Sequence, residues 1–431
     1  MARSRSEKDS TSIPRIGYAC VTVGVPGTAH RTCTRRFATE EKLREIIAHN
    51  LDALFNQIAY NVAHNILLFR ISSDIIPFAG TTVNALDWAA LFEEKFKQIG
   101  ALIRQSGMRV SMHPGQYTVL NSPDSAVVAN AIADLAWHTR FLDALGVTGE
   151  CKIIVHIGGV YGNKITAMKR FADNYRLLSP EVRSRLVIEN DERSFSVEDV
   201  LCLHGEIGAP VVYDNLHREV YEGQALESHS EMILRCGKTW SIRDGRPKIH
   251  YAQQEGGKRK GAHSEFIRAA EFTSFFEAIR DAAPDIMLEV KDKNLSAVKC
   301  SLLVGRAPER NRLEEEWGRY KYLIMERSPE SYAAIRSLFS GRAAVRPMDF
   351  YLIAEGALSG QEDPGRAENA ALHVWGYFSV KATKSEKKTF FSRLDAYRTG
   401  KGSLAAVKGH LLRLAERYGE EYLLNSLYFY L

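Results

Sequence analysis

The chain has 431 residues, a net charge of +5 and 45% hydrophobic residues, which suits a globular protein with a barrel of about 250–300 residues and a smaller domain. No stretch approaches the roughly 18 uninterrupted apolar residues of a membrane span, so the composition excludes one. The mild basic excess permits nucleic-acid binding without establishing it, and six scattered cysteines with no Cys-x-x-Cys pair indicate reduced thiols in a cytoplasmic protein.

Residues 1–13 are polar and mixed in charge, so we expect a flexible leader rather than a secretory signal. The next 290 or so residues alternate between short β-rich runs and longer segments with helical periodicity. The predicted strands are Arg15–Val21, Ile66–Ser72, Arg109–Pro114, Lys152–Gly158, Arg185–Asp191, Pro210–His217, Pro247–Gln253 and Asp285–Lys293. The helices predicted between them include one that opens at Thr39, Leu86–Gln105, one that opens at Ser122, Ser196–Leu203 and Glu265–Ala282.

Eight β-then-α units predict an α/β fold, a closed (β/α)8 TIM barrel over residues 14–305. A doubly wound open sheet is the alternative, but no glycine-rich dinucleotide turn follows the first strand. After Lys299 the alternation stops, and the charged segment Arg306–Arg312 is a predicted linker. Residues 313–431 are predicted to form a separate C-terminal helical domain with helices at Glu314–Arg327, Pro329–Leu338, Ala367–Val380, Lys384–Tyr397 and Ser403–Leu424.

Side chains that can bind metals fall at the C-terminal ends of the predicted strands, which is the face where TIM-barrel active sites lie. They are five histidines and three carboxylates: His113, His156, Glu189, Asp214, His217, His250, His263 and Glu289. One such residue alone is usually a hydrogen-bonded core residue, but six successive strands with this ending are hard to explain as packing. The other histidines, His138 among them, lack this placement and are expected on surfaces or helices.

The number of these residues exceeds the three protein ligands that one catalytic metal typically needs. We therefore expect two or three divalent metals, with Glu189 and Asp214 as bridging ligands. Clustered metals suit phosphodiester hydrolysis, because they neutralise the phosphate and stabilise the leaving oxygen. Lys248 faces the same side of its strand as His250. A lysine ammonium cannot bind a metal, so Lys248 either pairs with an anion or is carboxylated.

Two loops at the barrel mouth suggest contacts with a nucleic acid. Gln116 and Tyr117 follow a Pro-Gly turn, where they could contact a base. Lys258, Arg259 and Lys260 form a basic loop before His263 and suggest phosphate contacts. An ordinary solvated loop would explain either segment equally simply. Tyr18, near the end of the first strand, also points toward the pocket region in this prediction.

The ordered strings RIGYACVT, LLFRIS, MHPGQY, VHIGG, IENDE, YDNLH, PKIHYAQ, GAHS and LEVKDK together resemble the UV-damage endonucleases over residues 14–300. The resemblance implies a TIM barrel that nicks double-stranded DNA immediately 5′ to UV photoproducts, leaving a 3′-OH and a 5′-phosphate. Abasic sites are another substrate class it suggests. It implies manganese, with zinc or magnesium as alternatives.

By the same resemblance, the eight residues above are the metal ligands and Lys248 is an N6-carboxylated lysine that joins them. Glu189, Lys248, His250 and Glu289 are then the expected catalytic residues. Gln116 and Tyr117 match the pair that probes the duplex, and Tyr18 matches a pocket tyrosine. Thr22 departs from the pattern, since an asparagine is expected there, and this puts one polar contact in doubt.

Two other hypotheses fit part of the sequence. A metal-dependent sugar isomerase or epimerase also places acids and histidines on barrel strand ends, although it needs fewer ligands. Alternatively, the C-terminal helices are the functional module and bind nucleic acid or a protein partner. The strings WGRYKYLIMERSP, HVWGYF and YLLNSLYFY in those helices resemble a small bacterial domain of unknown function. The sequence indicates no membrane partner.

Overall fold

The structure is a computed structural model that describes residues 14–223, 227–305, 310–341 and 344–431. The predicted leader and residues 306–309 of the predicted linker therefore lie outside the described residues. Within these ranges the chain divides into two compact units. The first contains all eight strands, and the second contains the chain from Leu302 onward with two short segments, Val23–Val25 and Arg268–Thr273.

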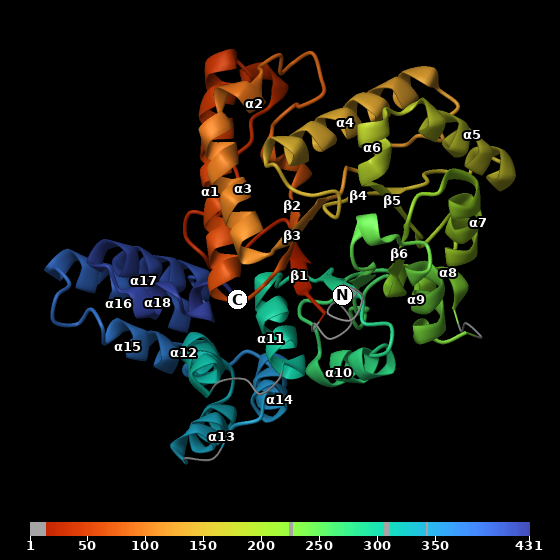
Figure 1. Cartoon of the computed structure of the whole chain (residues 1–431). Helices are drawn as coiled ribbons and strands as arrows, with labels where there is room; N and C mark the ends of the chain where they lie inside the picture. The colour runs from red at the N-terminus through yellow and green to blue at the C-terminus, as the bar shows by residue number, and fades with distance from the viewer. Residues whose placement is uncertain (1–13, 224–226, 306–309, 342–343) are drawn as a thin grey trace, which may run out of the picture. The chain divides into compact units, whose positions relative to one another are not determined.

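The first unit is a closed barrel of eight parallel strands in chain order, as predicted (Figure 1). The strands are β1 Ile16–Ala19, β2 Leu68–Ile71, β3 Arg109–Met112, β4 Ile153–His156, β5 Leu186–Glu189, β6 Val211–Asp214, β7 Lys248–Tyr251 and β8 Asp285–Leu288. Each lies inside one of the eight predicted runs. Nearly every strand residue is buried, because side chains fill the inside of the barrel and helices cover its outside.

Helices surround the strands, as Figure 1 shows. The longer ones are α1 Glu40–Ala63, α3 Glu93–Ser106, α4 Ser125–Ala144, α5 Lys164–Leu177, α7 Val197–Ile207, α8 Asn215–Glu222, α9 His229–Gly237, α10 Ala269–Ala278 and α11 Asn294–Val304. Two short helices are α2 Trp88–Leu91 and α6 Pro180–Arg185. The predicted helix Leu86–Gln105 is thus broken at Phe92, and helices α5, α6, α8, α9 and α11 had no predicted range.

One close approach inside the barrel requires glycine. A Cβ atom on Gly17 of β1 would lie 1.9 Å from the carbonyl oxygen of Leu68 in the paired strand β2. Any larger residue would push these two strands apart, so we expect Gly17 to tolerate no substitution.

Charged side chains at the N-terminal ends of the strands are paired with one another. Asp285, which begins β8, accepts hydrogen bonds from Arg109 Nη1 at 3.1 Å and from the Arg15 backbone at 3.0 Å. Lys152, just before β4, donates to Asp244 at 2.6 Å. These buried charges therefore have partners of their own at the end of the barrel opposite to the candidate site.

The second unit is helical and has its own apolar core. Its helices are α12 Arg310–Arg327, α13 Pro329–Ser340, α14 Pro347–Leu358, α15 Pro364–Trp375, α16 Lys384–Arg398, α17 Leu404–Tyr418 and α18 Glu421–Leu424. Its main core contains Phe378, Phe390 and Leu411, all fully buried. The sequence predicted five helices here. It did not predict α14, and it joined α17 and α18, which Gly419 separates in a left-handed conformation. No helix in the described residues is both long and apolar enough to cross a membrane.

Candidate metal centre

The barrel brings the predicted metal-binding residues to one end. His156 and Glu189 end β4 and β5 and are paired directly in the strand register. Asp214, which ends β6, is paired in the same way with His250 of β7. His113 and Glu289 each follow the last residue of a strand. Parallel strands in one register therefore place these side chains around a common point.

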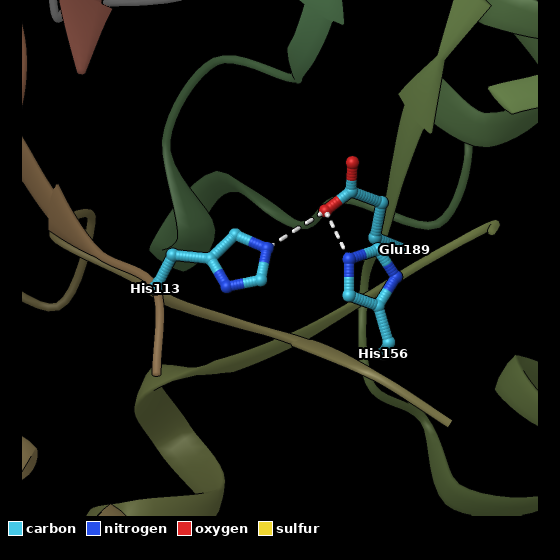
Figure 2. Close-up of side chains that lie close together, drawn as sticks. All are labelled: His113, His156 and Glu189. Atoms are coloured by element: carbon cyan, nitrogen blue, oxygen red, sulfur yellow. Dashed lines mark hydrogen bonds and ion pairs between the residues drawn. The ribbon is translucent and has the colours of Figure 1, made fainter. Parts of the chain in front are cut away.

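Glu189 lies at the centre of this cluster. Its Oε2 is 3.2 Å from His113 Nε2 and 3.7 Å from His156 Nε2, and Figure 2 shows both rings directed at that oxygen. Its Oε1 is 2.7 Å from His250 Nδ1 and 3.6 Å from His217 Nδ1. One buried carboxylate thus contacts four imidazoles from four different βα units.

The hydrogen bonds of two histidines indicate that a cation belongs in this cluster. His113 Nδ1 lies 3.0 Å from the Pro114 carbonyl oxygen, and His217 Nδ1 lies 3.0 Å from that of Asn190. A carbonyl only accepts, so both Nδ1 atoms carry the proton. In the neutral rings Nε2 is then a lone-pair donor, and it faces the oxygens of Glu189 and Glu192. Such a pairing needs a shared proton or a metal ion between the two atoms.

Buried polar atoms without partners support a metal rather than protons alone. Among the described residues, His156 Nδ1, Asp214 Oδ2 and His250 Nε2 are buried and lack any hydrogen-bond partner. Unpaired buried polar atoms are rare in proteins because each one costs free energy. Two sets of ligand atoms lie within 4.8 Å of one another, His113 with His156 and Glu189, and Glu189 with Asp214 and His250. Nitrogen and carboxylate donors in such sets suit zinc, manganese or iron.

Glu289 and His263 complete the cluster on another side. Glu289 Oε1 is 3.3 Å from His250 Nδ1, and its Oε2 is 3.8 Å from His263 Nε2. His263 reaches this position because its loop forms an antiparallel bridge with Gln254. Glu289 also accepts a hydrogen bond of 2.6 Å from Arg70 Nη1, and both side chains are largely buried.

The carboxyl groups of Glu189 and Asp214 differ in how readily they ionise, because their surroundings shift their pKa values in opposite directions. Burial opposes ionisation of Glu189, but the charges of His250 and His156 outweigh burial and hold the pKa of Glu189 well below its usual range. For Asp214, burial raises the pKa to about 6, with the charge of His217 acting in the other direction. Glu189 is therefore the more persistent anion, as a ligand shared between cations should be.

Lys248 lies deep in the barrel and is only 2% exposed. Burial, followed by the nearby cations Arg109 and Arg70, lowers its pKa well below the usual range, and Glu189 and Asp285 offset this only in part. Within the described part of the chain, no carboxylate oxygen lies within ion-pair distance of its amine. Pairing with a carboxylate, one of the two predicted explanations for Lys248, therefore has no candidate partner among the described residues.

A cavity of about 1270 Å³ opens above the cluster. His113, His156, Glu189, His217, His263 and Glu289 are in its wall. Of the predicted DNA contacts, Gln116 and Arg259 line the cavity too, and Tyr117 is 72% exposed beside Gln116. Lys258 instead donates to Glu265 at 2.9 Å, and Lys260 is exposed and is not among the lining residues.

Tyr18 is placed differently from the prediction. Its side chain is fully buried, and it is not one of the residues in the cavity wall. Its hydroxyl lies 2.7 Å from Thr22 Oγ1 and 2.8 Å from Asn61 Oδ1. Thr22, the departure noted in the sequence, therefore contacts Tyr18 inside the protein.

Several residues of the site were missed by the sequence reasoning. Arg70 is the clearest, since an arginine inside an apolar strand run needs a buried partner, and that signal was present. Lys291 and Lys293 line the cavity just beyond Glu289. His138, expected to be an ordinary helix residue, lies in α4 but is buried and bonded to Ser73 Oγ at 2.9 Å. Ser73 in turn donates to the carbonyl of His113 and so helps to position that ligand.

Comparison with known proteins identifies the barrel. The family described as UV-endonuclease UvdE matches residues 14–305. The chain belongs to the UvdE family. Residues 321–431 of this UvdE-family protein match a second family, described only as a protein of unknown function (DUF1722).

Relatives agree with the family match. A UV DNA damage endonuclease of Clostridium perfringens (strain 13 / Type A) is 40% identical over 327 residues, which is 75% of this chain and 79% of the relative. One of Bacillus cereus (strain Q1) is 33% identical over 262 residues, 60% of this chain and 82% of the relative. The crystal structure of SacUVDE superposes with a TM-score of 0.63 at 36% identity, covering 67% of this chain and 96% of that one.

Proposed function

We propose that this UvdE-family protein is a metal-dependent endonuclease that nicks double-stranded DNA immediately 5′ to UV photoproducts and leaves a 3′-OH and a 5′-phosphate. The observation that carries the proposal is the convergence of eight metal-binding side chains at the mouth of the barrel, around Glu189. Family membership and the names of the relatives support the choice of substrate.

In this proposal two or three divalent metals, manganese in the first instance, are held by the predicted ligands. Glu189 would be shared between them, since its two oxygens face different pairs of histidines. Bound metals supply charge neutralisation of the scissile phosphate and a hydroxide nucleophile near neutral pH. The protein contributes the arrangement: carbonyl groups hold His113 and His217 so that their Nε2 atoms face the carboxylates of Glu189 and Glu192.

We further propose that Lys248 is carboxylated and joins the ligands. A carboxylated lysine is an anion, and it would sit near Arg70 and Arg109, the two cations that now disfavour its charged amine. Its lack of a carboxylate partner among the described residues also fits this change of charge. Mass spectrometry of the native protein tests it, because carboxylation adds about 44 Da and acid treatment removes it; an unmodified mass would exclude it.

The cavity fits a nucleic acid better than a sugar. Its volume of about 1270 Å³ exceeds the roughly 300–1,000 Å³ of typical small-molecule pockets. Cations line it on several sides: Arg70, Arg193, Arg259, Lys291 and Lys293. We propose that they hold the DNA backbone and that Gln116 and the exposed Tyr117 contact bases at the lesion. We include no direct contact of Tyr18 with DNA, because its side chain is buried.

A nicking assay tests the function. Purified protein with manganese is incubated with two matched duplexes, one carrying a single pyrimidine photoproduct and one undamaged, with and without chelator. We expect a chelator-sensitive cut immediately 5′ to the lesion, on the damaged duplex alone. A third duplex with one abasic site defines the lesion range. No cut on any of the three would overturn the proposal, and ketoses and aldoses would be tested next.

A further inference from the structure

The second unit carries a local concentration of positive charge. Residues 380–413 contain nine lysines and arginines and two acidic residues. This local excess is larger than the net charge of +5 of the entire chain. Five of the nine basic residues and both acidic residues lie on α16, and the other four basic residues lie in the segments before and after it.

Three of the lysines form one exposed face of α16. Lys384, Lys387 and Lys388 are spaced so that their side chains are neighbours on the helix surface, about 5–6 Å apart at Cβ. Phe390 and Leu394 of the same helix are buried in the apolar core, beside this exposed face. The next residue on the exposed face is Phe391, which is 41% exposed and packs edge-on against Trp375 at 5.8 Å. We call Lys384, Lys387, Lys388 and Phe391 the α16 stripe.

Nothing else in the unit explains the α16 stripe. No carboxylate in the described part of the chain lies within ion-pair distance of its three ammonium groups, whereas Lys381 and Arg398 are paired with Glu420 and Glu368. The three lysines also lie in the first five residues of α16, at the positive end of the helix dipole, where cations destabilise a helix. Three unpaired cations at an unfavourable position indicate selection for an external anion.

We propose that the α16 stripe binds the DNA phosphate backbone and forms a second DNA contact, separate from the barrel cavity. The inference rests on the proposed function, which makes DNA the polyanion that the protein meets. Closely spaced lysines suit successive phosphates. The anchored, half-exposed ring of Phe391 adds an apolar surface for a sugar or base. An acidic protein surface is the competing occupant, and the test separates the two.

The test compares full-length wild-type protein with the variant K384Q/K387Q/K388Q. The control K42Q/K97Q/K169Q removes the same charge from exposed lysines on barrel helices α1, α3 and α5. Fluorescence anisotropy measures binding to a short undamaged duplex, with chelator present, over a range of salt concentrations. Circular dichroism checks folding, which we expect to be unchanged, because the substituted side chains are exposed and poorly placed for the helix dipole.

Each lost phosphate contact lowers the salt dependence of log Kd by about 0.9. We therefore expect the slope of log Kd against log salt concentration to be smaller by about 2.7 in the stripe variant than in the wild type. Its affinity near 0.1 M salt should fall by at least about ten-fold, while the control keeps the wild-type slope. Equal binding by the stripe variant and wild type would overturn the proposal and leave a protein partner. Equal losses in both variants would also overturn it, since net charge alone would then explain them.

Binding to undamaged DNA is measured without cleavage, so its result is independent of the proposed function. If the wild type fails to nick any damaged duplex, the catalytic proposal fails while the binding result still stands. If nicking is present, the stripe variant should keep the wild-type kcat and show a raised KM. A fall in kcat at saturating DNA would contradict a role limited to backbone binding.

Discussion

Replacement of Glu189 by Gln tests the proposed metal centre most directly. Glutamine has the shape of glutamate, but it removes the negative charge that faces four imidazoles. The ligand atoms of each set lie within 4.8 Å of one another, so a cation among them is no more than about 4 Å from this charge. A pair of unit charges at about 4 Å interacts by about 4 kcal/mol at an effective dielectric constant of 20, and this is a lower bound for a divalent ion. That corresponds to about a thousand-fold, because each 1.4 kcal/mol or so is a factor of ten.

We expect E189Q to keep the fold. The amide oxygen can still accept from His250 Nδ1, and the amide nitrogen can donate to the unprotonated Nε2 of His113. Far-ultraviolet circular dichroism should therefore match the wild type. Manganese binding by calorimetry, and nicking under single-turnover conditions at fixed metal, should each fall by about a thousand-fold.

The matched control is E277Q, which makes the same substitution at an exposed residue of α10. It should bind manganese and nick DNA like the wild type. If a folded E189Q retained more than a tenth of wild-type nicking, Glu189 would not be a shared metal ligand, and the reasoning from the geometry of the cluster would be refuted.

Three further predictions follow from single contacts. R70M should destabilise the metal-free protein by about 3 kcal/mol in urea unfolding, because the buried carboxylate of Glu289 loses its arginine partner. Recovery of stability in R70M/E289Q would support this reasoning, and no recovery would contradict it. D285N should cost a similar amount, about 3 kcal/mol, by leaving Arg109 without its carboxylate; urea unfolding measures this loss, and unchanged stability would contradict it. Y117A should weaken binding to the damaged duplex by about 1–3 kcal/mol, the contribution typical of one base stacked on an aromatic ring. Fluorescence anisotropy in the presence of chelator measures this affinity, and an unchanged value would show that Tyr117 does not contact the DNA.

The sequence determined the barrel and most residues at its mouth. Buried parallel strands appear in the sequence as short apolar runs. A polar residue stands at the end of several of these runs, so His113, His156 and Glu189 could be recognised as a series. Helices α11 and α14 are among those that had no predicted range. Residues 294–300 of α11 are buried on all sides, and α14 exposes Leu352, so neither shows the polar face that reveals helical periodicity.

Only the tertiary structure decided how the residues meet. Sequence spacing could not show that Glu189 faces four imidazoles, because those imidazoles come from different βα units. It also could not show that Lys258 and Lys291 both donate to Glu265, that Lys293 lines the cavity, or that Tyr18 is buried. Local sequence sets which residue types end the strands, whereas the direction of each side chain depends on neighbours distant in the chain.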